Sequence, residues 1–234
     1  MSEELKTIQE TAKATQEVAK TTGKAIDAAE KLGKFVSKYI AGSLEQGMGI
    51  VHDKLMYMRW ERQQRYMARA QLFLKQLGLE EPSRAVPMQL LIPMLQGASL
   101  EENDELQDRW AKLLVNAADA ESRVVVTRNY ITILEHLTPY DARVLDKIYS
   151  VPEQEFARGF WVCGVVNEFY PDPSNIDAKN PPAELRLALE SLMQLGVITG
   201  NPGYSGNPTF LIYQNMLGRS FVNACKLRDE KQAI

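Results

Sequence analysis

The sequence predicts a mainly α-helical protein with one β-hairpin near its C-terminal end. Apolar residues recur every three or four positions over most of the chain before residue 196, as they do in amphipathic helices. Several segments also begin or end with the residues that usually cap helices. Strand signals on both sides of a glycine- and proline-rich turn are confined chiefly to about Val197–Gln214, which indicates a hairpin there.

The composition is that of an ordinary globular protein. The 234 residues are 45% hydrophobic and 24% charged, enough for a packed core in one or two domains. The net charge of −3 argues against a general attraction to nucleic acid. Cys163 and Cys225 are the only cysteines and lie in unlike contexts, which suits the reducing cytoplasm. We expect no secretory signal and no membrane-spanning helix, since no apolar stretch of 18 residues occurs.

The first 50 residues form a heptad-like region that glycines interrupt. Glu3, Glu10 and Glu17 each stand three positions before a lysine, so opposite charges fall on neighbouring helical turns. The apolar seam consists mostly of small residues, which is too weak for a stable coiled coil. Two interpretations stay open. The region is a marginal helix that orders only on contact, or a helix shaped for close approach to another helix.

A short apolar patch lies in the same region and is made up of Phe35, Val36, Tyr39 and Ile40. Lysines at 31, 34 and 38 stand beside it. The patch either packs on the protein's own core, as most amphipathic helices do, or contacts a membrane surface or a second protomer. We favour packing on the core, because four glycines within Gly33–Gly49 interrupt a sustained membrane face.

Residues 53–77 are predicted to form a basic helix. Its arginines follow three- and four-residue steps and form one stripe, made up of Arg59, Arg62, Arg65 and Arg69. Such a stripe could contact a protein partner or an anion such as a nucleic-acid phosphate or an anionic lipid. Residues 99–121 hold seven acidic and two basic residues and could pair with it inside the fold. We favour a solvated or internally paired stripe, because the whole chain is mildly acidic.

Residues 84–149 carry the densest helix signals. Ser99 and Glu102 have the spacing of a capping box and predict a helix start. The apolar face of that helix is predicted to comprise Leu106, Trp110, Leu113, Leu114 and Ala117. The sequence LTPYD around Thr138 supplies a hydroxyl cap, a proline and an acid, and predicts a second start.

The order of elements after Thr138 is similar to that of a winged-helix module. A helix at about 139–149 precedes an unassigned segment, a helix ended by Gly196, a hairpin and a closing helix. The full prediction is therefore a helical N-terminal and central region followed by a winged-helix-like C-terminal module with one β-hairpin. Fold alone does not determine function, so we use the surface charge to infer what such a module contacts.

That charge disfavours DNA. The helix before the hairpin carries Arg186 against Glu184 and Glu190, and the hairpin loop contains no lysine or arginine. Because phosphate neutralisation supplies most non-specific DNA affinity, this surface lacks the charge that DNA binding needs. We expect the module to contact a protein.

The sequence offers no recognisable catalytic, cofactor-binding or metal site. His52 and His136 are the only histidines, and neither has a second ligand at metal-binding spacing. The two cysteines lie in apolar surroundings typical of buried, inert thiols. Phosphate-binding loops and nucleophile motifs are absent from the sequence. We therefore expect a protein that is not an enzyme and uses no cofactor or metal.

Three stretches resemble the abortive infection alpha (Abi-alpha) family of bacterial proteins: VPMQLLIPMLQGASLEENDELQDRWAKLLVNAAD, ILEHLTPYDARVL and LGRSFVNAC. The family is associated with defence against phage and has no assigned reaction, so no catalytic residue can be transferred. The resemblance implies a bacterial or prophage-encoded antiviral defence factor that acts in the cytoplasm or at the periphery of the inner membrane.

Three functional hypotheses follow from these observations. We favour a non-enzymatic anti-phage factor that senses or binds a protein, such as a phage component, a toxic partner or a second copy of itself. The second hypothesis is a membrane-acting effector that uses the N-terminal helices, and the third is a winged-helix regulator that binds nucleic acid. The expected divisions are 1–50 for the N-terminal region, 51–137 for the Abi-alpha-like core and 138–234 for the winged-helix-like module.

Overall fold

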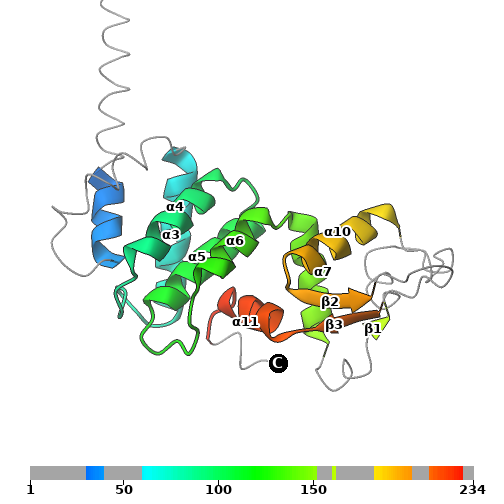
Figure 1. The fold of residues 1–234 in the computed structure, drawn as a ribbon. Coiled ribbons are helices and arrows are strands. Elements are labelled where there is room, and N and C mark those ends of the chain that lie inside the picture. Colours follow the sequence, from blue (N-terminus) through cyan, green and yellow to red (C-terminus); the bar gives the residue numbers. More distant parts are fainter. Residues whose placement is uncertain (1–29, 40–59, 152–159, 162–181, 202–210, 229–234) are drawn as a thin grey trace, which may run out of the picture.

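The computed structural model describes residues 30–39, 60–151, 160–161, 182–201 and 211–228. These residues are mostly helical, with a short antiparallel sheet at one end of the molecule (Figure 1), so the predicted mainly helical class with a hairpin near the C-terminal end is confirmed. The labelled elements are α3 (Trp60–Gln76), α4 (Met88–Leu100), α5 (Asp104–Ala118), α6 (Arg128–His136), α7 (Pro139–Ser150), β1 (Phe160–Trp161), α10 (Ala183–Gln194), β2 (Ile198–Asn201), β3 (Leu211–Gln214) and α11 (Met216–Ala224).

Helix α5 is central to the helical half of the molecule. Helices α3 and α4 pack against it, and α4 also contacts α6. All five residues of its predicted apolar face are buried, so that prediction is confirmed. The Trp110 ring lies against Gly97 of α4, where an added Cβ would come within 2.5 Å of the ring. A glycine at this position lets the largest side chain of the core fit between the two helices.

The predicted capping box at Ser99 and Glu102 is wrong. Ser99 lies inside α4, buried, and its hydroxyl donates to the Gln96 carbonyl oxygen at 2.7 Å. Helix α5 begins instead after Asn103, whose side-chain oxygen accepts from the Leu106 amide at 3.1 Å. Asparagine caps helices as well as serine does, and the apolar run of α4 continues past the position that spacing suggested.

The predicted start at Thr138 is confirmed. The Thr138 hydroxyl accepts from the Asp141 amide, and the Asp141 carboxylate accepts from the Thr138 amide, both at 3.1 Å. The predicted end of α10 is also confirmed. Gly196 follows that helix with φ +73°, a left-handed conformation that glycine adopts without strain.

The sheet has three antiparallel strands in the order β1-β3-β2. Thr199 on β2 stands opposite Tyr213 on β3, which confirms the predicted hairpin. On the other edge of β3, Phe160 pairs with Ile212. The sequence left Phe160 in an unassigned aromatic run, so β1 is a strand that pattern analysis missed. Helix α10 lies against α7 and β2.

Helix α11 lies between the helical half and the sheet (Figure 1) and contacts both α5 and α7. The Tyr149 hydroxyl of α7 donates to the Val197 carbonyl oxygen at 2.6 Å. Asn215 caps α11, since its side-chain oxygen accepts from the Gly218 amide at 2.8 Å. The Asn215 amide donates to the Tyr149 hydroxyl at 3.1 Å, and the Asn215 side-chain nitrogen donates to the Gly196 carbonyl oxygen at 2.8 Å, so the ends of α7, α10 and α11 are joined at one place.

Residues 30–39 form a further helical segment at the outer end of the helical half, blue in Figure 1. The predicted heptad region before it and the first part of the predicted basic helix lie outside the described residues. Within the described ranges, no helix combines the length and apolar character needed to cross a membrane.

Candidate functional site

The arginine stripe of α3 faces the acidic start of α5. Arg62 pairs with the Glu102 carboxylate and donates to the Leu100 carbonyl oxygen at 3.0 Å. Arg65 Nη1 lies 3.1 Å from an Asp104 carboxylate oxygen, and Arg69 Nη2 lies 2.8 Å from the same oxygen. Arg59 lies outside the described residues.

Among the described arginines of the stripe, Arg69 makes the most contacts. Its Nε lies 2.8 Å from Asp108 Oδ1, and its Nη1 donates to Gln107 Oε1 at 3.0 Å. Arg62 and Arg69 are largely covered, with side chains 14% and 22% exposed. These contacts correspond to internal pairing, the alternative that acidic residues 99–121 suggested. These pairs clamp α3 to α5 and cover most of Arg62 and Arg69, whereas the Arg65 side chain is 45% exposed.

The apolar patch of residues 30–39 turns inward. Phe35, Val36 and Tyr39 are buried, and the Phe35 ring centre lies 6.4 Å from that of Tyr66 on α3. The Val86 amide donates to the Tyr39 carbonyl oxygen at 2.7 Å, which fixes the segment to the chain before α4. Ile40 lies outside the described residues. Packing on the core is therefore the arrangement of this structure, and a membrane contact through these three side chains would need the segment to detach.

Two phenol groups in this contact are unusual. The hydroxyls of Tyr39 and Tyr66 are buried, and among the described residues neither has a hydrogen-bond partner. Burial raises the pKa of both phenols, and for Tyr66 the nearby Tyr39 raises the pKa further. An unpaired buried hydroxyl costs stability, so the segment is held by apolar contact more than by hydrogen bonds.

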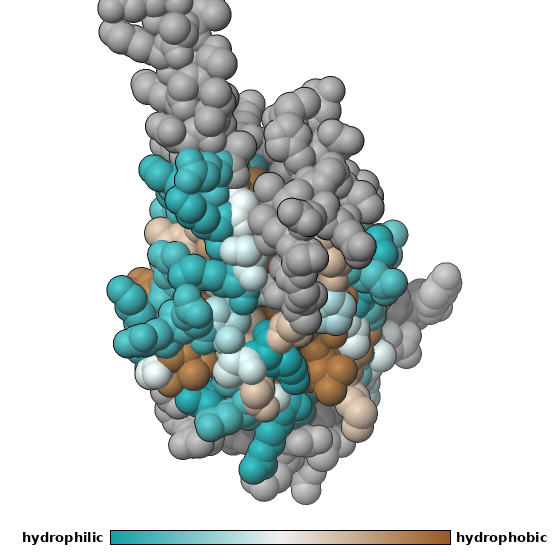
Figure 2. Space-filling model, turned by 90° about the vertical axis from the view of Figure 1, so that its left-hand side faces the viewer, coloured by the Kyte–Doolittle hydropathy of each residue, from teal (hydrophilic) through white to brown (hydrophobic). Residues whose placement is uncertain are grey.

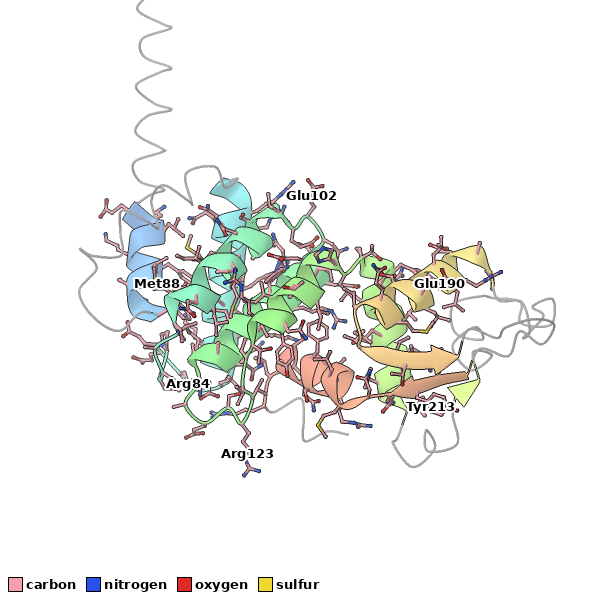
Figure 3. All side chains as sticks on the ribbon, in the orientation of Figure 1. Arg84, Met88, Glu102, Arg123, Glu190 and Tyr213 are labelled. Carbon is pink, nitrogen blue, oxygen red and sulfur yellow. The ribbon has the colours of Figure 1, made fainter. Side chains whose placement is uncertain are left out.

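Helix α10 presents a different kind of surface. Leu185, Ala188 and Leu192 face the core and are buried. The outer side exposes Glu184, Leu187 and Glu190, with Leu187 at 66% exposure. The sticks of Figure 3 show Glu190 on this helix, in the half of the molecule that holds the sheet. A leucine between two carboxylates is therefore presented to solvent on a helix whose inner face is firmly packed.

A groove of about 720 Å³ lies between the loop after α5 and helix α11. Its wall includes Val125, which is 77% exposed, and Tyr130. Arg123 projects from the loop away from the helices in Figure 3. Arg228, on the opposite wall, is held by Glu121 and by the Leu77 carbonyl oxygen at 3.0 Å. Pattern analysis missed this groove. The run of three valines at 124–126 was the sequence signal that could have indicated an apolar surface here.

The remaining reactive side chains have structural positions. His136 ends α6, and its Nδ1 lies 2.8 Å from the Thr132 carbonyl oxygen. Cys225 is buried, as predicted, and burial raises the pKa of its thiol to about 12. His52 and Cys163 lie outside the described residues. Across the described ranges, no three histidine, cysteine or acidic side chains come together in a way that could hold a metal ion.

Comparison with known families gives one match. The model of the family described as "Abortive infection alpha" matches residues 61–232, which is more than half of the chain. The match spans the elements from α3 to α11 and includes all three stretches that resemble the family. Comparisons with curated proteins and with solved structures gave no match.

Proposed function

Because this chain belongs to the abortive infection alpha family, we propose that it serves in bacterial defence against phage as a non-enzymatic factor that acts by binding a protein. The binding surface in this proposal is the outer face of α10. The proposed site of action is the cytoplasm, with contact at the inner membrane as the alternative location.

The observation that supports this proposal is the exposed leucine of α10 with its two acidic neighbours. The order α7, β1, α10, β2 and β3, with strand order β1-β3-β2, is compatible with a winged-helix-like module. In helix-turn-helix proteins, to which such modules are related, the second helix enters the major groove. The proposal gives α10 the place of that helix and a protein as its partner.

The chemistry of α10 suits a protein partner better than DNA. Glu184 and Glu190 would repel phosphates, and the Leu187 side chain has neither a charge nor a donor with which to bind one. In this proposal Leu187 is the hot spot: the partner buries its apolar side chain, and the polar residues around it form the rim of the contact. The matching partner is a protein with a small apolar pocket bordered by lysine or arginine side chains, because opposite charges across an interface favour encounter.

The direct test is protection of cells against phage. Cells that express the wild-type protein should give fewer plaques with at least one phage from a broad panel. Leu187→Arg combined with Glu190→Lys should raise plaque numbers to the level of cells without the protein, since the hot spot and its charge are both lost. The melting temperature should stay close to that of the wild type, because both side chains are exposed.

Leu72→Arg is the matched control. Leu72 is an exposed leucine on α3, 53% exposed, and far from α10 in the sequence. This variant should protect cells as the wild type does. The proposal is wrong if the folded α10 variant still protects fully, and the defence role itself is wrong if the wild type protects against no phage.

A further inference from the structure

A small cavity between residues 30–39 and helix α3 has a basic wall. Its volume is about 240 Å³. This is less than the roughly 300–1,000 Å³ of pockets that hold drug-sized ligands, so the cavity suits one small group. The lining residues that matter here are Lys31, Lys34, Lys38, Gln64, Phe35 and Met67. Figure 2 shows this end of the molecule, where hydrophilic residues, in teal, cover much of the described surface.

The lysines give the cavity a positive charge. They recur at helical spacing and so stand on one side of the segment. Lys34 Nζ lies 2.5 Å from a Glu30 carboxylate oxygen, and Lys38 Nζ lies 3.2 Å from one of Glu81. Neither glutamate is among the described residues that line the cavity, and the described α3 residues there are uncharged. A cleft lined by charges of one sign concentrates ions of the opposite sign.

Gln64 adds a second, independent observation. Its side-chain Nε2 is buried, and among the described residues it has no acceptor for its hydrogens. A buried donor without an acceptor costs free energy, and a turn of the Gln64 side chain into the cavity would let an oxygen of a bound anion remove that cost. Phe35 and Met67 supply apolar wall, which strengthens the attraction between charges beside it.

We propose that this cavity binds a phosphate-type anion. A phosphate has several oxygens and more than one negative charge, so it can compete with Glu30 and Glu81 for Lys34 and Lys38 and also meet Lys31, which a single carboxylate does less well. The phosphate belongs either to a soluble phosphate compound or to a phospholipid headgroup. The inference is independent of the α10 surface, because the two sites lie at opposite ends of the molecule (Figure 1).

The first arm of the test uses inorganic phosphate and the full chain. Exchange of chloride for phosphate at constant ionic strength should raise the melting temperature of the wild type to a plateau, because a ligand that binds only the folded state stabilises it. The triple variant Lys31→Gln, Lys34→Gln and Lys38→Gln should lose the shift. The control variant Lys75→Gln, Arg123→Gln and Arg128→Gln removes as many exposed charges elsewhere and should keep it.

The second arm identifies the source of the phosphate by flotation with vesicles. Vesicles of phosphatidylcholine are compared with vesicles that also contain phosphatidylglycerol. If phosphate raises the melting temperature but the protein does not float with vesicles, the ligand is a soluble phosphate compound. If the protein floats only with vesicles that contain phosphatidylglycerol, the ligand is a phospholipid headgroup. In either case binding should depend on the three lysines.

Gln64→Glu is the second variant, since it places a carboxylate at the cavity with a single conservative change. It should abolish whichever binding the wild type shows, even if the triple variant folds poorly. The proposal is overturned if neither phosphate nor phosphatidylglycerol binds, or if the cavity variants and the control variant lose binding equally.

Discussion

Several polar side chains hold the core together by bonding to helix ends, and Asn116 is one of them. It is buried on α5, and its side-chain nitrogen donates to the carbonyl oxygens of Ala224 at 2.8 Å and Lys226 at 2.9 Å. Its side-chain oxygen accepts from the Ser122 hydroxyl at 2.9 Å. Arg84 acts similarly at the end of α5, where its side chain donates to two of the last carbonyl oxygens. Helix ends leave such carbonyls unpaired, so these side chains supply partners that the backbone lacks.

Adding one methyl group at Gly218 should lower the stability of the protein. A Cβ there would lie 1.9 Å from the Val197 carbonyl oxygen, a backbone atom that cannot move aside cheaply. Gly218→Ala should therefore lower the free energy of unfolding by about 1–3 kcal/mol, although alanine normally favours a helix. Thermal or urea unfolding measures this.

The control for that prediction lies on the same helix. Asn223 is exposed, so Asn223→Ala should change stability by no more than about 0.5 kcal/mol. Equal stability of the two variants would show that α11 is not packed against Val197 as the structure has it.

At the residue scale, local signals predicted what depends on local geometry. Thr138 and Gly196 fix their helix ends by bonds and backbone angles within a few residues, and the sequence identified both. Gly218 could not be recognised in this way, because the atoms that require a glycine come from Val197 and Tyr149, distant in the sequence. The capping-box prediction at Ser99 was wrong for a related reason. Serine can cap a helix or lie inside one, and the choice depended on how far α4 extends.

At the scale of elements, residue spacing predicted only part of the contact between α3 and α5. The three- and four-residue steps predict that the arginines share one face of a helix. Charge pointed to residues 99–121 as the acidic segment that this face could meet, but neither spacing nor charge says which of its carboxylates the arginines contact. Asp104 is the shared partner of Arg65 and Arg69, and it also lies in the first turn of α5, where a carboxylate favours the helix dipole.

Asp104→Asn should therefore destabilise the protein by about 1 kcal/mol, a modest amount because the Asp104 side chain is 68% exposed and solvent screens the pairs. Glu105→Gln is the control, since Glu105 lies in the same helical turn but makes none of these arginine contacts. Urea unfolding should show a larger loss for the Asp104 variant at low salt. In 1 M sodium chloride, where the screening length falls to about 3 Å, the difference should shrink. An unchanged difference at high salt would contradict the ionic nature of this clamp.

Pattern analysis missed β1 for a physical reason. It is two residues long and depends on pairing with β3 for its conformation. An apolar aromatic run of that length fits a strand or a buried helix equally well, so periodicity alone cannot assign it.

At the scale of the whole molecule, the helical half and the sheet half are joined through α11 and α7. Arg109 on α5 pairs with Asp146 on α7, and Asn116 holds the end of α11. The basic cavity lies at one end of the molecule and the outer face of α10 at the other (Figure 1). The groove of Val125 lies beside α11, between them. A single chain thus offers separate surfaces, so variants of one surface can be tested without disturbing another.

The functional assignment has a different source from the fold. Spacing and charge disfavoured a DNA-binding surface on the helix before the hairpin and favoured a protein contact, but they could not indicate phage defence. That role comes from family membership over residues 61–232. The exposure of Leu187 could have been predicted, because the helical spacing of the buried Leu185, Leu189 and Leu192 places Leu187 on the opposite side of α10.

If the outer face of α10 contacts protein and not DNA, as proposed, the full chain should not bind mixed-sequence duplex DNA, and fluorescence anisotropy can measure this. The carboxylates of Glu184 and Glu190 and the net charge of −3 predict no saturable binding at micromolar protein, even at low salt. Charge reversal through Glu184→Lys and Glu190→Lys provides a comparison that should bind more tightly than the wild type. Micromolar affinity of the wild type that falls steeply with added salt would contradict the account and identify the module as a DNA-binding one.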